Sequence, residues 1–184
     1  MRVLLVGVSC VGKTTIGAAL ARRLDVPFFD LDTEIERHFG LSVERLQARF
    51  MTGYSYRKEC SVVLERILGD NPDCVVAVAP SGLRDAYLRV VCKVPCVTVA
   101  IHDLPENILE RITFYDVDSR RSDTLLSEAQ KQLYLREIKK DITYFNRSYR
   151  RADLHADIAG LGVEVSAELI EALVAEHRRG EPNP

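Results

Sequence analysis

Short apolar runs alternate with segments of helical periodicity along most of the chain. The runs are of strand length, and all but the last are continuously apolar, as strands covered on both faces are. The expected strands are 2–6, 26–29, 74–79, 96–101 and 154–158. The expected helices are 13–24, 33–39, 42–50, 54–69, 84–91, 105–113, 127–150 and 166–178. Strand–helix alternation of this kind predicts an α/β fold with a parallel sheet.

The pattern contains no internal repeat and no linker, so we expect a single domain over residues 1–176. Residues 177–184 are charged and rich in Gly and Pro, which is typical of a frayed tail. Segment 114–126 lies between two expected helices, has no clean period and carries the paired arginines Arg120 and Arg121.

Composition narrows the class of protein. The chain has 184 residues, of which 47% are hydrophobic and 28% charged, as in a folded globular protein. A formal charge of −2 argues against a bulk nucleic-acid binder. No apolar run approaches the ~20 residues of a membrane span, and the first run is too short for a signal peptide. We expect a cytoplasmic monomer with neither a nucleic-acid nor a membrane partner. Five cysteines without a C-x-x-C pair suggest neither disulfides nor zinc.

The sequence from Gly7 to Thr14, GVSCVGKT, fits the phosphate-loop pattern G-x-x-x-x-G-K-[ST]. It follows the first expected strand and opens the first expected helix, which is the context that the motif requires. Backbone N–H groups and the helix N-terminus would bind phosphate, and Lys13 would add a full charge. The expected nucleotide-binding residues are Val11, Gly12, Lys13, Thr14 and Thr15. The site would bind ATP or GTP, but the guanine signature N-K-x-D is absent, and the short chain favours a small-molecule or nucleotide kinase.

Two acidic residues, Asp30 and Asp32, follow the second expected strand. In an extended segment they share one side. Beside a phosphate loop, one could serve Mg²⁺ and the other could orient or deprotonate an acceptor hydroxyl. The alternative interpretation is that both cap the helix that starts near Thr33.

The N-terminal part of the sequence resembles the shikimate kinase family. The resemblance rests on the phosphate loop and three following motifs, which are Phe28–Asp32, Ile35–Glu36 and Gly40–Val43. It implies the P-loop, nucleoside-monophosphate-kinase-like fold, with five parallel strands in the order 2-3-1-4-5. It also implies ATP and Mg²⁺ as cofactors and transfer of the γ-phosphoryl group to a hydroxyl of shikimate.

The resemblance assigns roles to individual residues. Lys13 and Asp32 would be catalytic, together with an arginine of a lid at about 114–126. We assign this role to Arg120, with its neighbour Arg121 as the alternative, and the lid arginine would also contact the nucleotide. Thr14 and Asp30 would serve the metal. Arg111 would stack on adenine. The acceptor-binding helices would lie at about 33–69.

The acceptor motifs depart from the family pattern. Tyr56 stands where the family has a carboxylate-binding Arg, and Arg57 is one place late. The family's Gly-Gly-Gly turn reads Pro80-Ser81-Gly82, and Arg147 is off register from a second carboxylate-binding Arg. We nevertheless expect a small, anionic, hydroxylated acceptor, bound by Asp32, Arg57, Gly82 and Arg147.

Two other functions stay open. The protein could phosphorylate a different small acceptor, such as a sugar acid or a nucleoside, since residues 81–87 are faintly similar to gluconate kinases. It could also be an ATP-binding regulatory protein without transferase activity.

Overall fold

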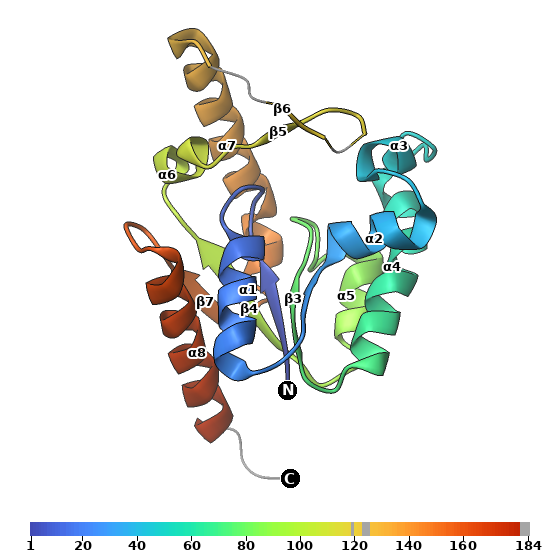
Figure 1. Ribbon diagram of the computed structural model, residues 1–184, viewed down its shortest axis with the longest axis vertical. Coiled ribbons are helices and arrows are strands. Elements are labelled where there is room, and N and C mark those ends of the chain that lie inside the picture. Colours follow the sequence, from blue (N-terminus) through green and yellow to red (C-terminus); the bar gives the residue numbers. More distant parts are fainter. Residues whose placement is uncertain (119, 123–125, 181–184) are drawn as a thin grey trace.

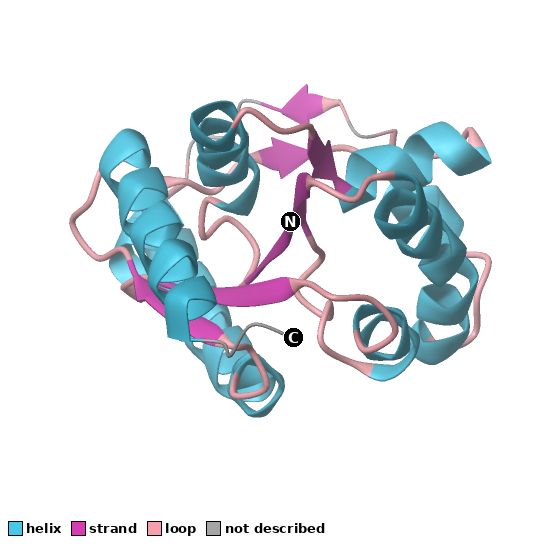
Figure 2. Cartoon of the chain, turned by 90° about the horizontal axis from the view of Figure 1, so that it is seen from below, coloured by secondary structure: helices cyan, strands magenta, loops and turns pink. Residues whose placement is uncertain are grey.

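The computed structural model describes residues 1–118, 120–122 and 126–180, and it shows a parallel sheet with helices on both sides (Figures 1 and 2). The five strands of the sheet lie in the order β2-β3-β1-β4-β7. Their bounds are β1 Arg2–Val6, β2 Phe28–Asp30, β3 Cys74–Ala77, β4 Val97–His102 and β7 Leu154–Asp157. The expected fold and strand order are confirmed.

The central strand β1 explains why its sequence is continuously apolar. It pairs with β3 on one side and β4 on the other, and Val3 to Val6 are fully buried. A strand in this position has no solvent-facing side, so alternation of polar residues is absent. All five strands are parallel, so their carboxyl ends meet at one edge of the sheet. At this edge the phosphate loop follows β1, and Asp30 is the last residue of β2.

Eight helices surround the sheet in the described part of the chain. They are α1 Lys13–Leu24, α2 Leu31–Phe39, α3 Val43–Gln47, α4 Gly53–Asp70, α5 Asp85–Val91, α6 Pro105–Glu110, α7 Glu128–Tyr149 and α8 Val163–Gly180. Helix α1 packs against α8, α4 against α5, and α6 against α7. None of the described helices is long and apolar enough to cross a membrane.

Several boundaries differ from the expectation by one to three residues; α3 ends at Gln47 and α6 at Glu110, before their expected ends at 50 and 113. Two further regions differ in kind. Helix α8 begins at Val163 and continues to Gly180, so residues 177–180 form its last turn rather than part of a frayed tail. Residues 181–184 lie outside the described residues. Segment 114–126 contains a short antiparallel hairpin of β5, Phe114–Tyr115, and β6, Arg121–Ser122, which the sequence pattern did not predict.

A close contact sets the distance between α1 and the sheet. Gly17 on α1 faces the ring of Phe28 on β2, and a Cβ at Gly17 would lie 2.6 Å from Phe28 Cε2 and 3.1 Å from Leu5 Cδ1. Only glycine fits at this point. The helix that follows the phosphate loop therefore lies directly on the strand that leads to Asp30.

Candidate active site

The phosphate loop connects β1 to α1 in a conformation that its sequence permits. Gly12, the N-cap of α1, has a φ of 108°, which L side chains rarely adopt. A Cβ at Gly7 would lie 2.9 Å from the carbonyl oxygen of Ile101 on β4. The two glycines of the motif are therefore required for different reasons. Gly12 allows the backbone conformation, and Gly7 allows the close approach to β4.

Lys13 closes the loop on itself. Its Nζ donates to the carbonyl oxygens of Gly7 at 3.0 Å and Val8 at 2.9 Å. Burial lowers the pKa of Lys13 to about 8, although the nearby carboxylates of Asp32 and Asp30 favour its charged form. The expected phosphate ligand is thus a partly buried lysine near both acidic residues. Val11 is buried, while Thr14 and Thr15 are exposed at the start of α1.

Asp30 both caps a helix and faces the phosphate loop. Its Oδ1 accepts from the backbone N–H groups of Asp32 at 3.1 Å and Thr33 at 3.4 Å, at the start of α2. Its Oδ2 accepts from Thr14 Oγ1 at 2.6 Å. The capping interpretation is therefore correct for Asp30, and it is compatible with the second role because the two oxygens have different partners.

Asp32 lies in the first turn of α2 and is the acidic residue of the pair with a shifted pKa. Burial and the Asp30 carboxylate raise the pKa of Asp32 to about 6, against the opposing charge of Lys13. A carboxylate with this pKa is ionised at pH 7 and can still accept a proton, which suits a general base.

The oxygens of Thr14 and Asp30 fit a magnesium ion. Mg²⁺ prefers hard oxygen ligands and is commonly held by one or two protein groups, with water and phosphate oxygens completing its shell. In the described ranges no group of three or more His, Cys, Asp or Glu side chains could hold a metal. A site that relies on the nucleotide for most of its ligands agrees with both observations.

The acceptor side contains buried hydroxyl and thiol groups on α4 and α5. Tyr56, at the position of the family's arginine, is 7% exposed, and burial raises its pKa well above the usual range. Burial also raises the pKa of the Cys60 thiol to about 11, so it stays protonated. Tyr87 is fully buried, and in the described part of the chain its hydroxyl has no nitrogen or oxygen partner and contacts only the weakly bonding Cys60 thiol. The position to which the resemblance assigns a charged arginine is here part of a neutral interior.

The guanidinium group of Arg57 is already paired with a carboxylate of this protein. Its Nε and Nη2 both donate to Asp85 Oδ2, at 3.0 and 2.5 Å. Asp85 begins α5 and has a φ of 49°, an uncommon conformation for a residue with a side chain. No sequence pattern predicts Asp85 as the partner of Arg57, because the two residues are 28 positions apart and follow no motif.

The turn at residues 80–83 is anchored from α7. Tyr149 Oη donates to the Pro80 carbonyl at 3.0 Å, and Arg151 Nη1 donates to that of Leu83 at 3.1 Å. The N–H of Gly82 donates to the Ala79 carbonyl at 2.8 Å, and a Cβ on Gly82 would lie 2.9 Å from Val78 Cβ. Gly82 therefore serves the turn itself. Arg147 is exposed on α7.

The nucleotide-side arginines occupy different settings. Arg111, the C-cap of α6, forms an ion pair with the buried side chain of Asp103. Burial tends to raise the pKa of Asp103, but hydrogen bonds from Arg111, Asn107 and the Leu104 N–H lower it overall. Arg120 is exposed in the β5–β6 turn, and its N–H donates to Asp116 Oδ1 at 2.9 Å.

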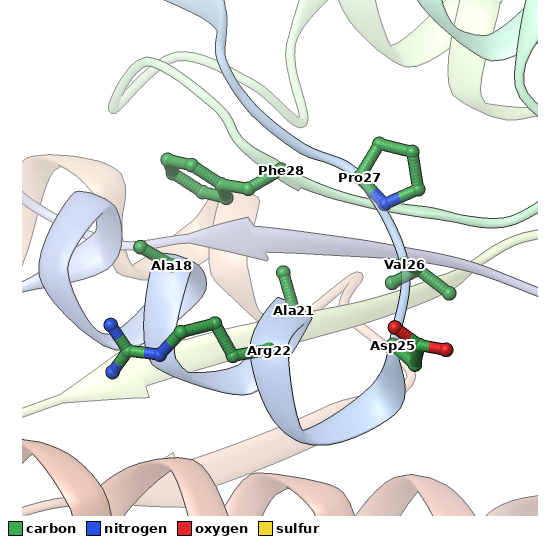
Figure 3. Close-up of a pocket in the computed structure, with 7 residues that line it drawn as sticks. All are labelled: Ala18, Ala21, Arg22, Asp25, Val26, Pro27 and Phe28. Atoms are coloured by element: carbon green, nitrogen blue, oxygen red, sulfur yellow. The ribbon is translucent and has the colours of Figure 1, made fainter.

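Two hollows lie near α1. One of about 200 Å³ adjoins the phosphate loop, where Val8 and Val11 face Ile108 and Tyr149. The other, of about 580 Å³, is lined by residues of the C-terminal half of α1 and the segment that leads to Phe28 (Figure 3). The second hollow lies at the opposite end of α1 from the loop, so it is not part of the phosphate site.

Comparisons with known proteins agree with this site. A family model described as shikimate kinase matches residues 9–173. The shikimate kinase of Aquifex aeolicus is 36% identical over 175 residues, covering 94% of this chain and 96% of that protein. The bifunctional shikimate kinase/3-dehydroquinate synthase of Thermotoga maritima is 34% identical over 153 residues, covering 83% of this chain but only 29% of that longer protein.

A solved structure extends the agreement to three dimensions. The shikimate kinase from Acinetobacter baumannii, in complex with shikimate, superposes with a TM-score of 0.71 at 25% identity, covering 96% of this chain and 94% of that chain. The matched residues run from the phosphate loop to α8 and include Lys13, Asp30 and Asp32. The chain belongs to the shikimate kinase family, a family of phosphotransferases that use ATP.

Proposed function

We propose that the protein transfers the γ-phosphoryl group of ATP to a hydroxyl of shikimate. The observation that carries the proposal is Asp32, a partly buried carboxylate near Lys13 and two residues after Asp30, which is paired with Thr14. The pKa of Asp32 is raised to about 6. A base of this kind beside a phosphate loop matches the needs of phosphoryl transfer to a hydroxyl.

Each residue would contribute positioning or charge. Lys13 and the loop N–H groups bind the phosphates, and Lys13 exchanges its two carbonyl partners for phosphate oxygens. Thr14 and Asp30 hold Mg²⁺, which when bound neutralises developing charge on the phosphates. Asp32 orients the acceptor hydroxyl and accepts its proton. Arg120 adds positive charge from the lid, and Arg111 contacts the base.

A second candidate is transfer to a different small acceptor, such as a sugar acid or a nucleoside. The observation that favours it is the acceptor side itself. Tyr56 is buried where the family has an arginine, and Arg57 is already paired with Asp85. An acceptor carboxylate would have to compete with Asp85 for Arg57, or be bound by another group.

An acceptor panel distinguishes these functions. The protein is given ATP, Mg²⁺ and shikimate at millimolar concentration, with gluconate and nucleosides in parallel, and ADP release is followed. Asp32→Asn is the control, since it should abolish acceptor-dependent release. Shikimate-dependent ADP supports the first proposal, and a signal from another acceptor alone supports the second. Background hydrolysis with every acceptor would instead indicate a regulatory ATP-binding protein.

A further inference from the structure

The tip of the lid hairpin contacts the acceptor-side helix α3 rather than ending in solvent. Figure 1 shows the β5–β6 hairpin reaching from α6 and α7 toward α3. Two contacts join them. Ser42 Oγ donates to the Val117 carbonyl at 2.5 Å, and Arg45 Nε donates to Asp118 Oδ1 at 2.5 Å.

The α3 side of this contact is organised by the start of the helix. Ser42 is the N-cap of α3, and its Oγ also accepts from the Arg45 N–H at 3.3 Å. The N–H of Val43 donates to Glu36 Oε1 at 2.9 Å, which ties α3 to α2, the helix that begins beside Asp32. The groups that contact the lid thus belong to the same body as the acceptor-side carboxylate.

The lid side is a turn that holds its own shape. Asp116 Oδ1 accepts from the N–H groups of Asp118 at 2.8 Å and Arg120 at 2.9 Å. The N–H of Asp116 in turn donates to the Arg120 carbonyl at 2.9 Å. The Asp116 side chain thus links the backbone N–H groups of Asp118 and Arg120, so a contact that holds Asp118 also restrains Arg120.

We propose that Arg45 and Asp118 form a latch that holds the lid over the site and thereby positions Arg120 for phosphoryl transfer. Arg45 is a positioning residue, since it acts through the turn and not on the substrate. The proposal rests on the proposed function for its effect on transfer, but the latch itself does not depend on which acceptor is used.

The charges around the pair favour its closed form. The hydrogen bond to Arg45 lowers the pKa of Asp118, and the hydrogen bond to Asp118 raises that of Arg45. Both side chains are about half exposed, at 52% for Arg45 and 42% for Asp118. Exposed ion pairs are weak and sensitive to salt, which suits a contact that must open in every catalytic cycle.

Limited trypsin cleavage after Arg120 or Arg121 measures release of the latch without reference to any substrate. Arg45→Ala and Asp118→Asn are compared with wild type. Arg37→Ala is the matched control, because Arg37 is an exposed arginine on α2 that forms an ion pair with its neighbour Glu34 and not with the lid residues described. Cleavage in the lid should be roughly two- to five-fold faster in the first two variants, in line with the loss of an exposed pair. About 1 M salt should bring wild type to their rate. Equal lid cleavage in wild type and both variants at low salt would overturn the latch.

Kinetics then test the positioning role. With the acceptor found by the panel, Arg45→Ala and Asp118→Asn should lower kcat by a similar factor and leave the KM for ATP unchanged. The charge-swapped variant Arg45→Asp/Asp118→Arg should recover part of the loss. Faster lid cleavage with unchanged kcat would overturn the positioning role. If wild type phosphorylates none of the acceptors, the proposed function fails, whereas the cleavage comparison still decides whether the latch exists.

Discussion

Asp32 is the residue on which the chemistry most depends, and its ionisation predicts a pH profile. Burial and Asp30 raise its pKa to about 6, so below that pH it is protonated and cannot accept the hydroxyl proton. We expect kcat/KM to fall as pH drops through about 6, since this ratio reports the free enzyme. In Asp32→Asn, turnover should be lower by ~10²-fold or more and flat across the same range.

The ionised Asp32 carboxylate should also lower the free energy of unfolding at neutral pH. A folded pKa raised above the ordinary value of 3.8 means that the folded protein binds more protons between about pH 4 and 6, so stability falls as pH rises through that window. Asp32→Asn should therefore raise the free energy of unfolding at pH 7, by about 1–3 kcal/mol. Urea unfolding at pH 7 and at pH 4 measures it, and the gain should shrink at the lower pH. A variant that is less stable at pH 7 would mean that Asp32 is a structural residue.

Tyr87 offers a second prediction at this scale. Its buried hydroxyl has no nitrogen or oxygen partner in the described part of the chain and meets only the weakly bonding Cys60 thiol, so Tyr87→Phe removes a polar group that burial penalises. We expect this variant to be as stable as wild type or more stable, by up to about 1 kcal/mol in urea unfolding. The matched control is Tyr149→Phe, which loses the hydrogen bond to Pro80 and should be destabilised by about 1 kcal/mol. Equal losses in both variants would show that Tyr87 has a partner.

The mutual placement of the phosphate-loop residues and Asp30 could be predicted from sequence, whereas the contacts of Arg57 could not; the functional roles of both sets stay predictions. Lys13, Thr14 and Asp30 lie in local motifs whose spacing is set by one strand, one loop and one helix. The Arg57–Asp85 pair joins two helices and depends on a backbone conformation at Asp85 that no sequence pattern announces. The roles of Arg57, Gly82 and Arg147 toward an acceptor stay predictions.

At the scale of elements, helix α1 packs on strand β2 through the contact between Gly17 and Phe28. This contact predicts that a larger side chain at Gly17 lowers the free energy of unfolding. Gly17→Ala would place a methyl group 2.6 Å from the Phe28 ring, so α1 or β2 must shift. We expect destabilisation by about 1–3 kcal/mol in urea unfolding. The double variant Gly17→Ala/Phe28→Leu should lose less than the sum of its single variants, because the two side chains compete for one space.

Gly69 is the control for that substitution. It lies on the exposed side of α4, and nothing stands within 4 Å of a Cβ there. Gly69→Ala should therefore be stabilising, by up to about 1 kcal/mol, because alanine favours the helix. A loss of stability at both glycines would point to helix distortion rather than to the contact with Phe28.

Element boundaries show where sequence patterns stop being informative. Four of the five strands of the sheet were predicted because they are continuous apolar runs, and β7 from a weaker run, whereas β5 and β6 have two residues each and no period to detect. Helix α8 starts before its expected first residue, Ser166. That serine is buried inside the helix, where its N–H and its Oγ both donate to the Gly162 carbonyl, at 2.9 and 2.8 Å. A residue type that favours helix starts was thus used as an internal hydrogen-bond donor.

For the molecule as a whole, nucleotide binding should raise the free energy of unfolding. A ligand that binds only the folded protein stabilises it by about 2.7 kcal/mol at a hundredfold excess over Kd. Mg²⁺ and ATP should raise the Tm of wild type and fail to raise that of Lys13→Ala, because that variant lacks the charge in the loop. Without ligand the Lys13→Ala variant should be at least as stable as wild type. Burial lowers the pKa of Lys13 to about 8, which means that folding disfavours its charged form. An equal rise in Tm for both proteins would contradict the phosphate-loop assignment.

The central place of β1 also has a consequence for synthesis on the ribosome. Its two neighbours are Cys74–Ala77 and Val97–His102, so the first strand to be made has its second partner only after about 90 more residues, roughly 5–20 s at ordinary translation rates. During that interval four consecutive apolar residues, Val3 to Val6, lack a complete set of partners. Gly7 packs on the backbone of Ile101, so the phosphate loop cannot take its shape before β4 is made. Nucleotide can therefore assist folding of the nascent chain only after more than half of it has been synthesised.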